Sequence, residues 1–267
     1  MGVGSGEINE LSLLKLVPEV LRAREFRLYT KEGRLVDLWQ NNGAAVLGHT
    51  PPSQLKEIKN AASRGLYAPF PHFLEARYRK ALSRIFPNRT FRLYSAPPPG
   101  LETLAANGSA VLWRPFTNPA SPLDVPESPP VLIPVVPGIQ TWRGGLPLGL
   151  CVLAIKGEAD ISPGDFLPPV LLAAAARGVY GLISVAQTRA NQAYPRVAVV
   201  LKNSPAKFWR RSGIYLTPGQ KPSETEWAGL FRRFLENGFL LPPNPSQPLI
   251  LPGVLSQGEE AKLAFLL

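Results

Sequence analysis

The chain has 267 residues, of which 45% are hydrophobic, and its mean hydropathy is +0.01. This length and composition exclude a disordered protein and are typical of one large globular domain or two small ones. The single cysteine excludes an internal disulfide bond and favours a reducing compartment.

No signal peptide is evident, because the first residues lack a basic segment followed by an apolar one. The apolar run at 146–155 is too short to cross a bilayer and contains Pro147 and Gly149. We therefore expect a cytoplasmic protein with no membrane partner.

The net charge of +10 is spread along the chain, with only short basic pairs such as Arg210-Arg211 and Arg232-Arg233. No helix-turn-helix, zinc-finger or RNP motif accompanies these pairs. A solvated basic surface explains the charge better than a dedicated nucleic-acid site. Binding of nucleic acid or another anion through this surface is the less favoured interpretation.

The first zone, up to about residue 91, predicts a hairpin and two helices. Residues 26–30 and 35–39 alternate around a turn at Gly33, which is typical of a hairpin. Residues 53–66 have helical spacing, with Leu55, Ile58 and Ala62 on the expected buried face. A second helix begins near residue 71 and ends before Pro87. Its expected buried face consists of Leu74, Tyr78, Ala81, Leu82 and Ile85.

The second zone, residues 95–137, is rich in proline, which lacks the N–H that helices and central strands need. Only a short helix at 101–106 and a strand at 131–136 are expected there. The third zone resumes regular structure. Its expected elements are a strand at 150–155, a helix at 166–183, strands at 196–201 and 212–217, and a helix at 224–236. Helices thus alternate with strands, so the fold class is α/β.

Residues 140–149, Gln-Thr-Trp-Arg-Gly-Gly-Leu-Pro-Leu-Gly, carry a family resemblance. They resemble the Gly-Gly-Leu-Pro-Leu-Gly turn of class III aminotransferases, the group that includes glutamate-1-semialdehyde aminomutase and ornithine aminotransferase. The hairpin at 28–38, the Leu-Gly-His element at 46–52 and the segment 227–243 are similar to family elements in the same order.

This resemblance implies a fold type I, pyridoxal phosphate (PLP) transferase architecture. The large domain would be reduced, and an α/β small domain would be made of the N- and C-terminal segments. The expected boundaries are 1–65 for an N-terminal hairpin and helix that belong to the small domain or a dimer arm, 66–205 for the reduced large domain with its proline-rich loop 95–137, and 206–267 for the C-terminal small domain.

The departures from the family fall on its cofactor site. The family's Schiff-base lysine precedes the Leu of the turn by six residues, and that position is Gln140, whose amide cannot form a Schiff base. Ser95 opens the loop that holds the PLP phosphate in the family, and Pro97, Pro98 and Pro99 lack the N–H groups such a loop uses. The family's aspartate for the pyridine nitrogen has no counterpart between residues 102 and 131.

Three other features have ordinary explanations. Lys156 follows a strand and could in principle replace the missing lysine, although a solvated strand-end lysine is the simpler interpretation. The acidic residues Glu158, Asp160 and Asp165 surround a Pro-Gly turn without a histidine, so a loop is expected there and no metal site. Cys151 lies in an apolar strand and is expected to be an inert, buried thiol.

The sequence therefore predicts a catalytically inactive, aminotransferase-like protein with no catalytic residues and no cofactor. It would act as a binding or assembly subunit, as a homodimer or as a heterodimer with a full-length aminotransferase. The aromatic residues of the first zone are expected mostly in the core, and since the family's N-terminal segment wraps over a dimer partner, some of them are candidate interface anchors; they are Phe26, Trp39, Tyr67, Phe70 and Phe73. The alternative is an active enzyme that holds PLP on Lys156.

Overall fold

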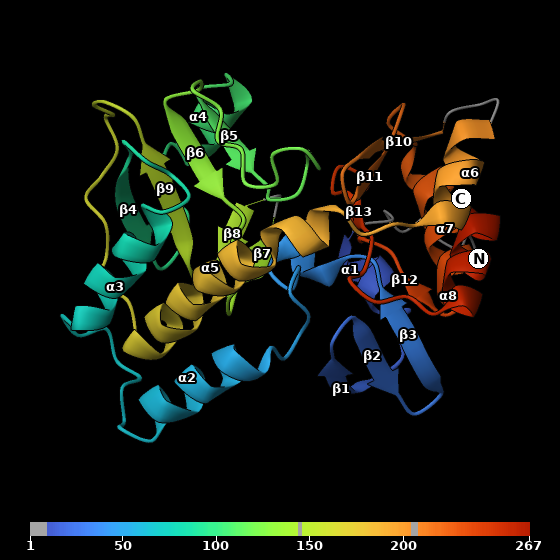
Figure 1. Ribbon diagram of the computed structural model, residues 1–267, viewed down its shortest axis with the longest axis horizontal. Helices are drawn as coiled ribbons and strands as arrows, with labels where there is room; N and C mark the ends of the chain where they lie inside the picture. Colours follow the sequence, from blue (N-terminus) through green and yellow to red (C-terminus); the bar gives the residue numbers. More distant parts are fainter. Residues whose placement is uncertain (1–9, 144–145, 204–207) are drawn as a thin grey trace, which may run out of the picture. The chain divides into compact units, whose positions relative to one another are not determined.

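The structure is a computed structural model that describes residues 10–143, 146–203 and 208–267 (Figure 1). The chain forms two compact units. The terminal unit comprises Met1–Asn42 and Gln192–Leu267, and the central unit comprises Gly43–Asn191. The sequence placed these divisions after residues 65 and 205. The helix at 52–62 packs against the long helix of the central unit and is therefore part of that unit.

A four-stranded sheet forms the middle of the central unit, in the order β4-β9-β6-β5. Its strands are β4 (Thr90–Tyr94), β5 (Ala110–Trp113), β6 (Val131–Pro134) and β9 (Cys151–Ile155). Strand β9 is antiparallel to both of its neighbours, and β5 is parallel to β6. Every residue of β6 and β9 is buried, which explains why both strands are continuous apolar runs without alternation.

Helices and one hairpin complete the central unit. They are α2 (Pro52–Ala62), α3 (Phe73–Leu82), α4 (Leu101–Ala106), α5 (Pro169–Ala190), and the hairpin of β7 (Thr141–Arg143) and β8 (Leu146–Leu148). Both α2 and α3 pack against α5, and Figure 1 shows α2 lying alongside it. The two glycines of the turn between β7 and β8 lie outside the described residues.

The terminal unit joins both ends of the chain in its two sheets. One has the order β1-β2-β3-β12 and the other β10-β11-β13. The strands are β1 (Val20–Arg24), β2 (Arg27–Thr30), β3 (Gly33–Asp37), β10 (Trp209–Ser212), β11 (Tyr215–Pro218), β12 (Phe239–Leu240) and β13 (Leu249–Ile250). Strand β12 pairs in parallel with β3, so the C-terminal segment extends the N-terminal hairpin. A small α/β unit made of both ends is the architecture that the sequence predicts.

Short helices accompany these sheets. They are α1 (Glu10–Leu14), a 3-10 turn at Gln40–Gly43 that ends at the unit boundary, α6 (Pro195–Asn203), α7 (Glu224–Glu236) and α8 (Gln257–Leu266). The predicted hairpin, the buried face of α3 and the helix α7 are all confirmed. Helix α7 begins with a Ser223–Glu226 capping box and ends at Asn237, before Gly238 with a positive φ of 82°.

Three predicted elements differ from the structure in type, extent or orientation. Residues 196–201 form part of helix α6, because α6 packs against α8 and the Glu260 carboxylate accepts hydrogen bonds from the first N–H groups of α6, at Arg196 and Val197. The predicted strand at 212–217 is a strand only over 215–217, which belong to β11, because the chain turns at Gly213 between β10 and β11. On α2 the buried residues are Gln54 and Ala61, whereas Leu55 is 39% exposed. Strand β5 was not predicted.

The longest apolar element is α5, and not the run at 146–155. Within the described part of the chain, it is the helix whose length and composition would allow it to cross a membrane. Half of its most apolar window is buried inside the protein. Buried core helices of soluble proteins meet the same criteria, so α5 alone is weak evidence for a membrane span.

Candidate functional site

The topology of the central sheet brings three chain segments to one edge. Because β9 is antiparallel to β4 and to β6, these two strands run in the same direction, and β5 runs with them. The segments that follow them begin at Ser95, Arg114 and Val135. Ligands of open α/β sheets bind outside the carboxyl ends of such strands, so this edge is the candidate site.

Ser95, directly after β4, holds the carboxylate of Asp165. The Ser95 N–H and hydroxyl both donate to the same Asp165 oxygen, at 2.9 Å and 2.7 Å. These two hydrogen bonds lower the pKa of the Asp165 carboxyl, which therefore stays ionised at neutral pH. The ionised Asp165 carboxylate thus accepts both hydrogen bonds that Ser95 can donate.

Asp165 is fixed by the backbone around it. Its N–H donates to the Leu93 carbonyl at 2.7 Å, and the Tyr94 hydroxyl donates to the Ser162 carbonyl at 2.6 Å. A Cβ on Gly164 would lie 2.6 Å from the Leu93 oxygen, so only glycine permits this close approach. Residues 159–165, predicted as a loop, lie along the outer edge of β4 as irregular backbone. No motif or periodicity in the sequence indicates that Asp165 would meet Ser95.

The loop between Ser95 and α4 offers few backbone donors. Pro97, Pro98 and Pro99 have no N–H. Gly100, in the left-handed region at φ 82°, is the N-cap of α4, which has only six residues. This loop therefore lacks the row of free N–H groups that usually holds a phosphate at a helix N-terminus.

Gln140 lies at the same edge, between β6 and β7, and is 5% exposed. The hairpin that it precedes returns to Ser95, because the Gly149 N–H donates to the Ser95 carbonyl at 3.2 Å. The Cβ position of Gly149 is 3.9 Å from the Ile139 oxygen. Through Gly149, the structure thus brings the segment around Gln140 close to Ser95. Ser95 and Gln140 are the two positions that the sequence singles out.

Comparisons with known proteins bear on the fold. No protein-family profile matches the chain. A relative from Treponema pallidum (strain Nichols), described as an uncharacterized protein, is 27% identical over 296 residues, with 92% of each chain covered. Ornithine delta-aminotransferase of Plasmodium falciparum has a TM-score of 0.65 at 10% identity, with 97% of each chain covered.

Two further solved structures agree. Ornithine aminotransferase of Plasmodium yoelii has a TM-score of 0.64 at 10% identity, covering 94% of this chain and 92% of its own. Acetylornithine aminotransferase of Elizabethkingia anophelis has a TM-score of 0.60 at 12% identity, covering 97% and 98%. The chain has an aminotransferase fold. Identities this low establish the fold and leave the activity open.

On this aminotransferase fold Lys156 is distant from the candidate site. It follows Ile155, which pairs with Thr90 and Val131, the first residues of β4 and β6. Lys156 therefore lies at the opposite edge of the sheet, about 16 Å from the Ser95 edge for a five-residue strand at roughly 3.3 Å per residue. Its ammonium forms an ion pair with the carboxylate of Glu127.

Cys151 lies close to the site without contributing reactivity. It pairs with Tyr94 across the β4–β9 ladder and is fully buried. Burial raises the pKa of the Cys151 thiol to about 12, so the thiol is protonated at neutral pH. The expected burial of this thiol is confirmed.

Proposed function

We propose that this protein is a catalytically inactive, degenerate relative of the class III aminotransferases, and that it acts in the cytoplasm as a binding or assembly subunit. The observation that carries the proposal is the Asp165 carboxylate on the donors of Ser95. It lies at the same edge of the central sheet as Gln140, where the family resemblance would place the Schiff-base lysine.

The residues at this edge do not fit PLP. A phosphate placed at Ser95 would meet the ionised Asp165 carboxylate, and like charges repel most strongly at short range. Backbone N–H groups usually bind the phosphate oxygens in such a loop, and the three prolines have none. Gln140 supplies a neutral amide without a nucleophilic lone pair. Three independent features therefore disfavour the cofactor.

The alternative, an active enzyme with PLP on Lys156, is not favoured by the geometry. Lys156 is paired with Glu127 at the edge opposite Ser95 and Gln140. A Schiff base there would need a second, unrelated cofactor site at that edge of the sheet.

PLP binding tests both ideas in one experiment. We expect the purified protein mixed with PLP to show no Schiff-base absorbance beyond that of free lysines, and borohydride reduction to leave no stoichiometric adduct. An active aminotransferase provides the positive control, and Lys156→Ala provides the matched variant. A stoichiometric reduced adduct that peptide mapping places on Lys156, and that Lys156→Ala abolishes, would establish the alternative.

The assembly surface lies on the segment that links α2 to α3 and on the first residue of α3. Tyr67, Phe70 and Phe73 are 62%, 55% and 65% exposed. His72 holds Phe73 in place, because its ring lies 4.4 Å from the Phe73 ring and its Nδ1 accepts the Leu74 N–H at 3.2 Å. Clustered exposed aromatic side chains mark interaction sites. Aminotransferases of fold type I build their active sites between subunits, which supports a chain of like fold as the partner.

We expect the protein to be a dimer and the double change Phe70→Ser/Phe73→Ser to weaken self-association at least about tenfold, since aromatic anchors contribute most of an interface's binding energy. Sedimentation velocity across a concentration series would measure this. Phe265→Ser is the matched control, because Phe265 is 87% exposed and lies in the terminal unit. If the Phe70/Phe73 variant dimerises as strongly as the wild type, this segment is not the interface. A monomeric wild type that pairs only with a full-length aminotransferase would indicate the heterodimer instead.

A further inference from the structure

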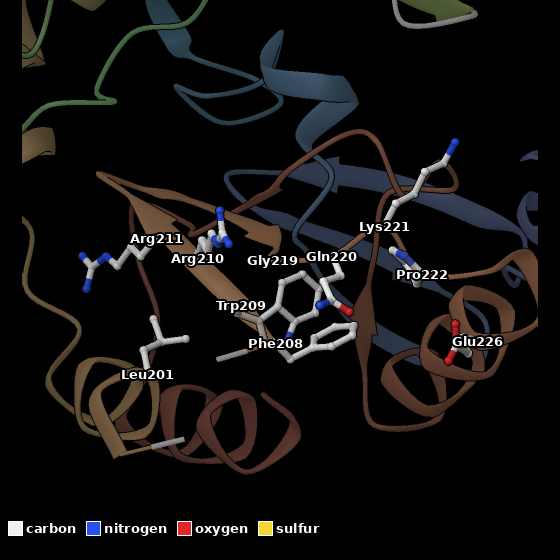
Figure 2. Close-up of a pocket in the computed structure, with 10 residues that line it drawn as sticks. All are labelled: Leu201, Phe208, Trp209, Arg210, Arg211, Gly219, Gln220, Lys221, Pro222 and Glu226. Atoms are coloured by element: carbon white, nitrogen blue, oxygen red, sulfur yellow. The ribbon is translucent and has the colours of Figure 1, made fainter. Parts of the chain in front are cut away.

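A basic hollow of about 630 Å³ lies in the terminal unit, remote in sequence from the candidate site. It is bordered by the end of α6, by β10 and by the loop 219–222 before α7 (Figure 2). The Gly219 N–H donates to the Phe208 carbonyl at 2.6 Å, which holds this loop against the start of β10. The volume of the hollow is within the range of small-ligand sites, about 300–1,000 Å³.

Two cations of the hollow are available to a ligand. Arg210 and Lys221 are exposed, and neither forms an ion pair within the described part of the chain. In Figure 2 both side chains extend toward the top of the view. The neighbouring Arg211 turns away, where its Nε donates to the Gly213 carbonyl at 2.8 Å and its guanidinium lies 5.4 Å from the Tyr194 ring. Of the basic pair Arg210-Arg211, Arg211 thus contacts its own unit, and Arg210 is available to a ligand.

Aromatic rings form the floor of the hollow. Phe208 and Trp209 contact each other edge to face, with ring centroids 5.0 Å apart. Trp209 is 6% exposed and is backed by Trp227 at 6.2 Å, whereas Phe208 is only half-buried and presents part of its ring to the hollow. A planar ring of a ligand would find an apolar face here at a fixed position.

The remaining polar groups are suited to neutral hydroxyl or amino groups. The exposed Gln220 side chain borders the aromatic floor (Figure 2). Glu226 is held by the Ser223 N–H and hydroxyl, both at 2.8 Å, and these hydrogen bonds lower the pKa of its carboxyl. An ionised carboxylate repels a phosphate but accepts hydrogen bonds from a sugar hydroxyl or an exocyclic amine.

We propose that this hollow binds a nucleotide, with the phosphates at Arg210 and Lys221 and the base against Phe208. Guanidinium and ammonium groups recognise phosphate, and aromatic side chains stack on every base. The nucleotide can be a free molecule or part of a single strand. This inference does not depend on the proposed function.

The test is a titration of the full chain with adenosine diphosphate at low salt, in which isothermal calorimetry measures the heat of binding. We expect saturable 1:1 binding, and binding at least about tenfold weaker for both inorganic pyrophosphate, which lacks the ring, and adenosine, which lacks the charge. Arg210→Ala/Lys221→Ala should weaken adenosine diphosphate binding at least about tenfold, and Phe208→Ala about fivefold. Arg232→Ala is the matched control, since Arg232 is an exposed cation of the same unit outside the hollow.

An oligothymidylate of about twelve nucleotides distinguishes the two sources. Tighter binding than the mononucleotide, lost in Arg210→Ala/Lys221→Ala, indicates a strand, and equal or weaker binding indicates a free nucleotide. The proposal is overturned if neither probe binds at millimolar concentration. It is also overturned if Arg232→Ala weakens binding as much as the double change does, because the effect would then be general electrostatic attraction. Circular dichroism confirms that each variant is folded.

Discussion

Replacing Gly178 with alanine should destabilise the central unit by about 3 kcal/mol, despite the better helix propensity of alanine. Gly178 lies in the middle of α5, where an added Cβ would be 2.2 Å from the Pro137 oxygen and 2.4 Å from the Gln54 Nε2. The Gln54 side chain can rotate away, but it would then lose its hydrogen bond to the Ala174 carbonyl, now 3.3 Å. Pro137 lies in the connection between β6 and β7, so its backbone can yield only by moving the chain that leads to Gln140.

Two other glycines of long helices provide the controls. The free energy of unfolding of each variant is measured by urea denaturation, with circular dichroism as the readout. A Cβ on Gly181, also in α5, would meet only the end of the Leu47 side chain, at 2.8 Å, so Gly181→Ala should cost less than about 1 kcal/mol. Gly229 in α7 has nothing within 4 Å of its Cβ position, and Gly229→Ala should stabilise by up to about 1 kcal/mol. Similar stabilities for Gly178→Ala and Gly181→Ala would show that α5 does not depend on this close contact.

The same contact explains why the orientation of α2 could not be predicted. Apolar periodicity placed Leu55, Ile58 and Ala62 toward the core. The helix instead buries Gln54, which reaches α5 where Gly178 leaves room for it. A buried glutamine satisfied by a carbonyl 120 residues away leaves no periodic signal in the sequence.

Local sequence pattern was sufficient to predict an element whose own residues carry its apolar stripe and caps. It was insufficient where contacts with a residue far along the chain determine the secondary structure. Helix α7 contains both its apolar stripe and its caps, and it was predicted to the residue. The Val-rich segment 196–201 favours a strand by propensity. It is helical because Glu260, about 60 residues later, accepts the N–H groups at its start and because Val197 is fully buried.

The candidate site shows the same division. Ser95 and Gln140 could be singled out because a linear motif resembles the family's turn and fixes their positions in the order of elements. Asp165 could not, since it lies 70 residues after Ser95 in a segment without regular structure. The motif thus pointed to Gln140 at the position where the resemblance places a lysine, and only the structure shows the carboxylate on the Ser95 donors.

The second large effect is expected at the Arg27–Glu259 pair, which links β2 near the N-terminus to α8 near the C-terminus. The Arg27 guanidinium donates to both carboxylate oxygens, at 3.0 Å and 2.6 Å, and the two side chains are only 10% and 12% exposed. Arg27→Met should destabilise the terminal unit by about 2–3 kcal/mol, because it removes the bidentate partner of a nearly buried carboxylate. The Ser256 N–H at 2.8 Å and the half-exposed Arg34 at 3.3 Å remain beside Glu259 and compensate part of the loss. Lys31→Met is the matched control. Lys31 pairs with Glu19 at 2.7 Å, but both side chains are about 70% exposed, and such pairs contribute less than about 1 kcal/mol.

The pH dependence provides a second, independent measurement. Burial by itself raises the pKa of the Glu259 carboxyl, but hydrogen bonds from Arg27 and from the Ser256 N–H outweigh it, and the net pKa is lowered. A carboxyl whose pKa is lower in the folded state stabilises the fold above its unfolded pKa, near 4.3, and loses this contribution as the pH falls through the folded pKa. The stability difference between wild type and Arg27→Met should therefore be full at pH 7 and shrink below about pH 4. A difference that stays constant from pH 7 to pH 3 would mean that Arg27 contributes through packing of its aliphatic stem and not through its charge.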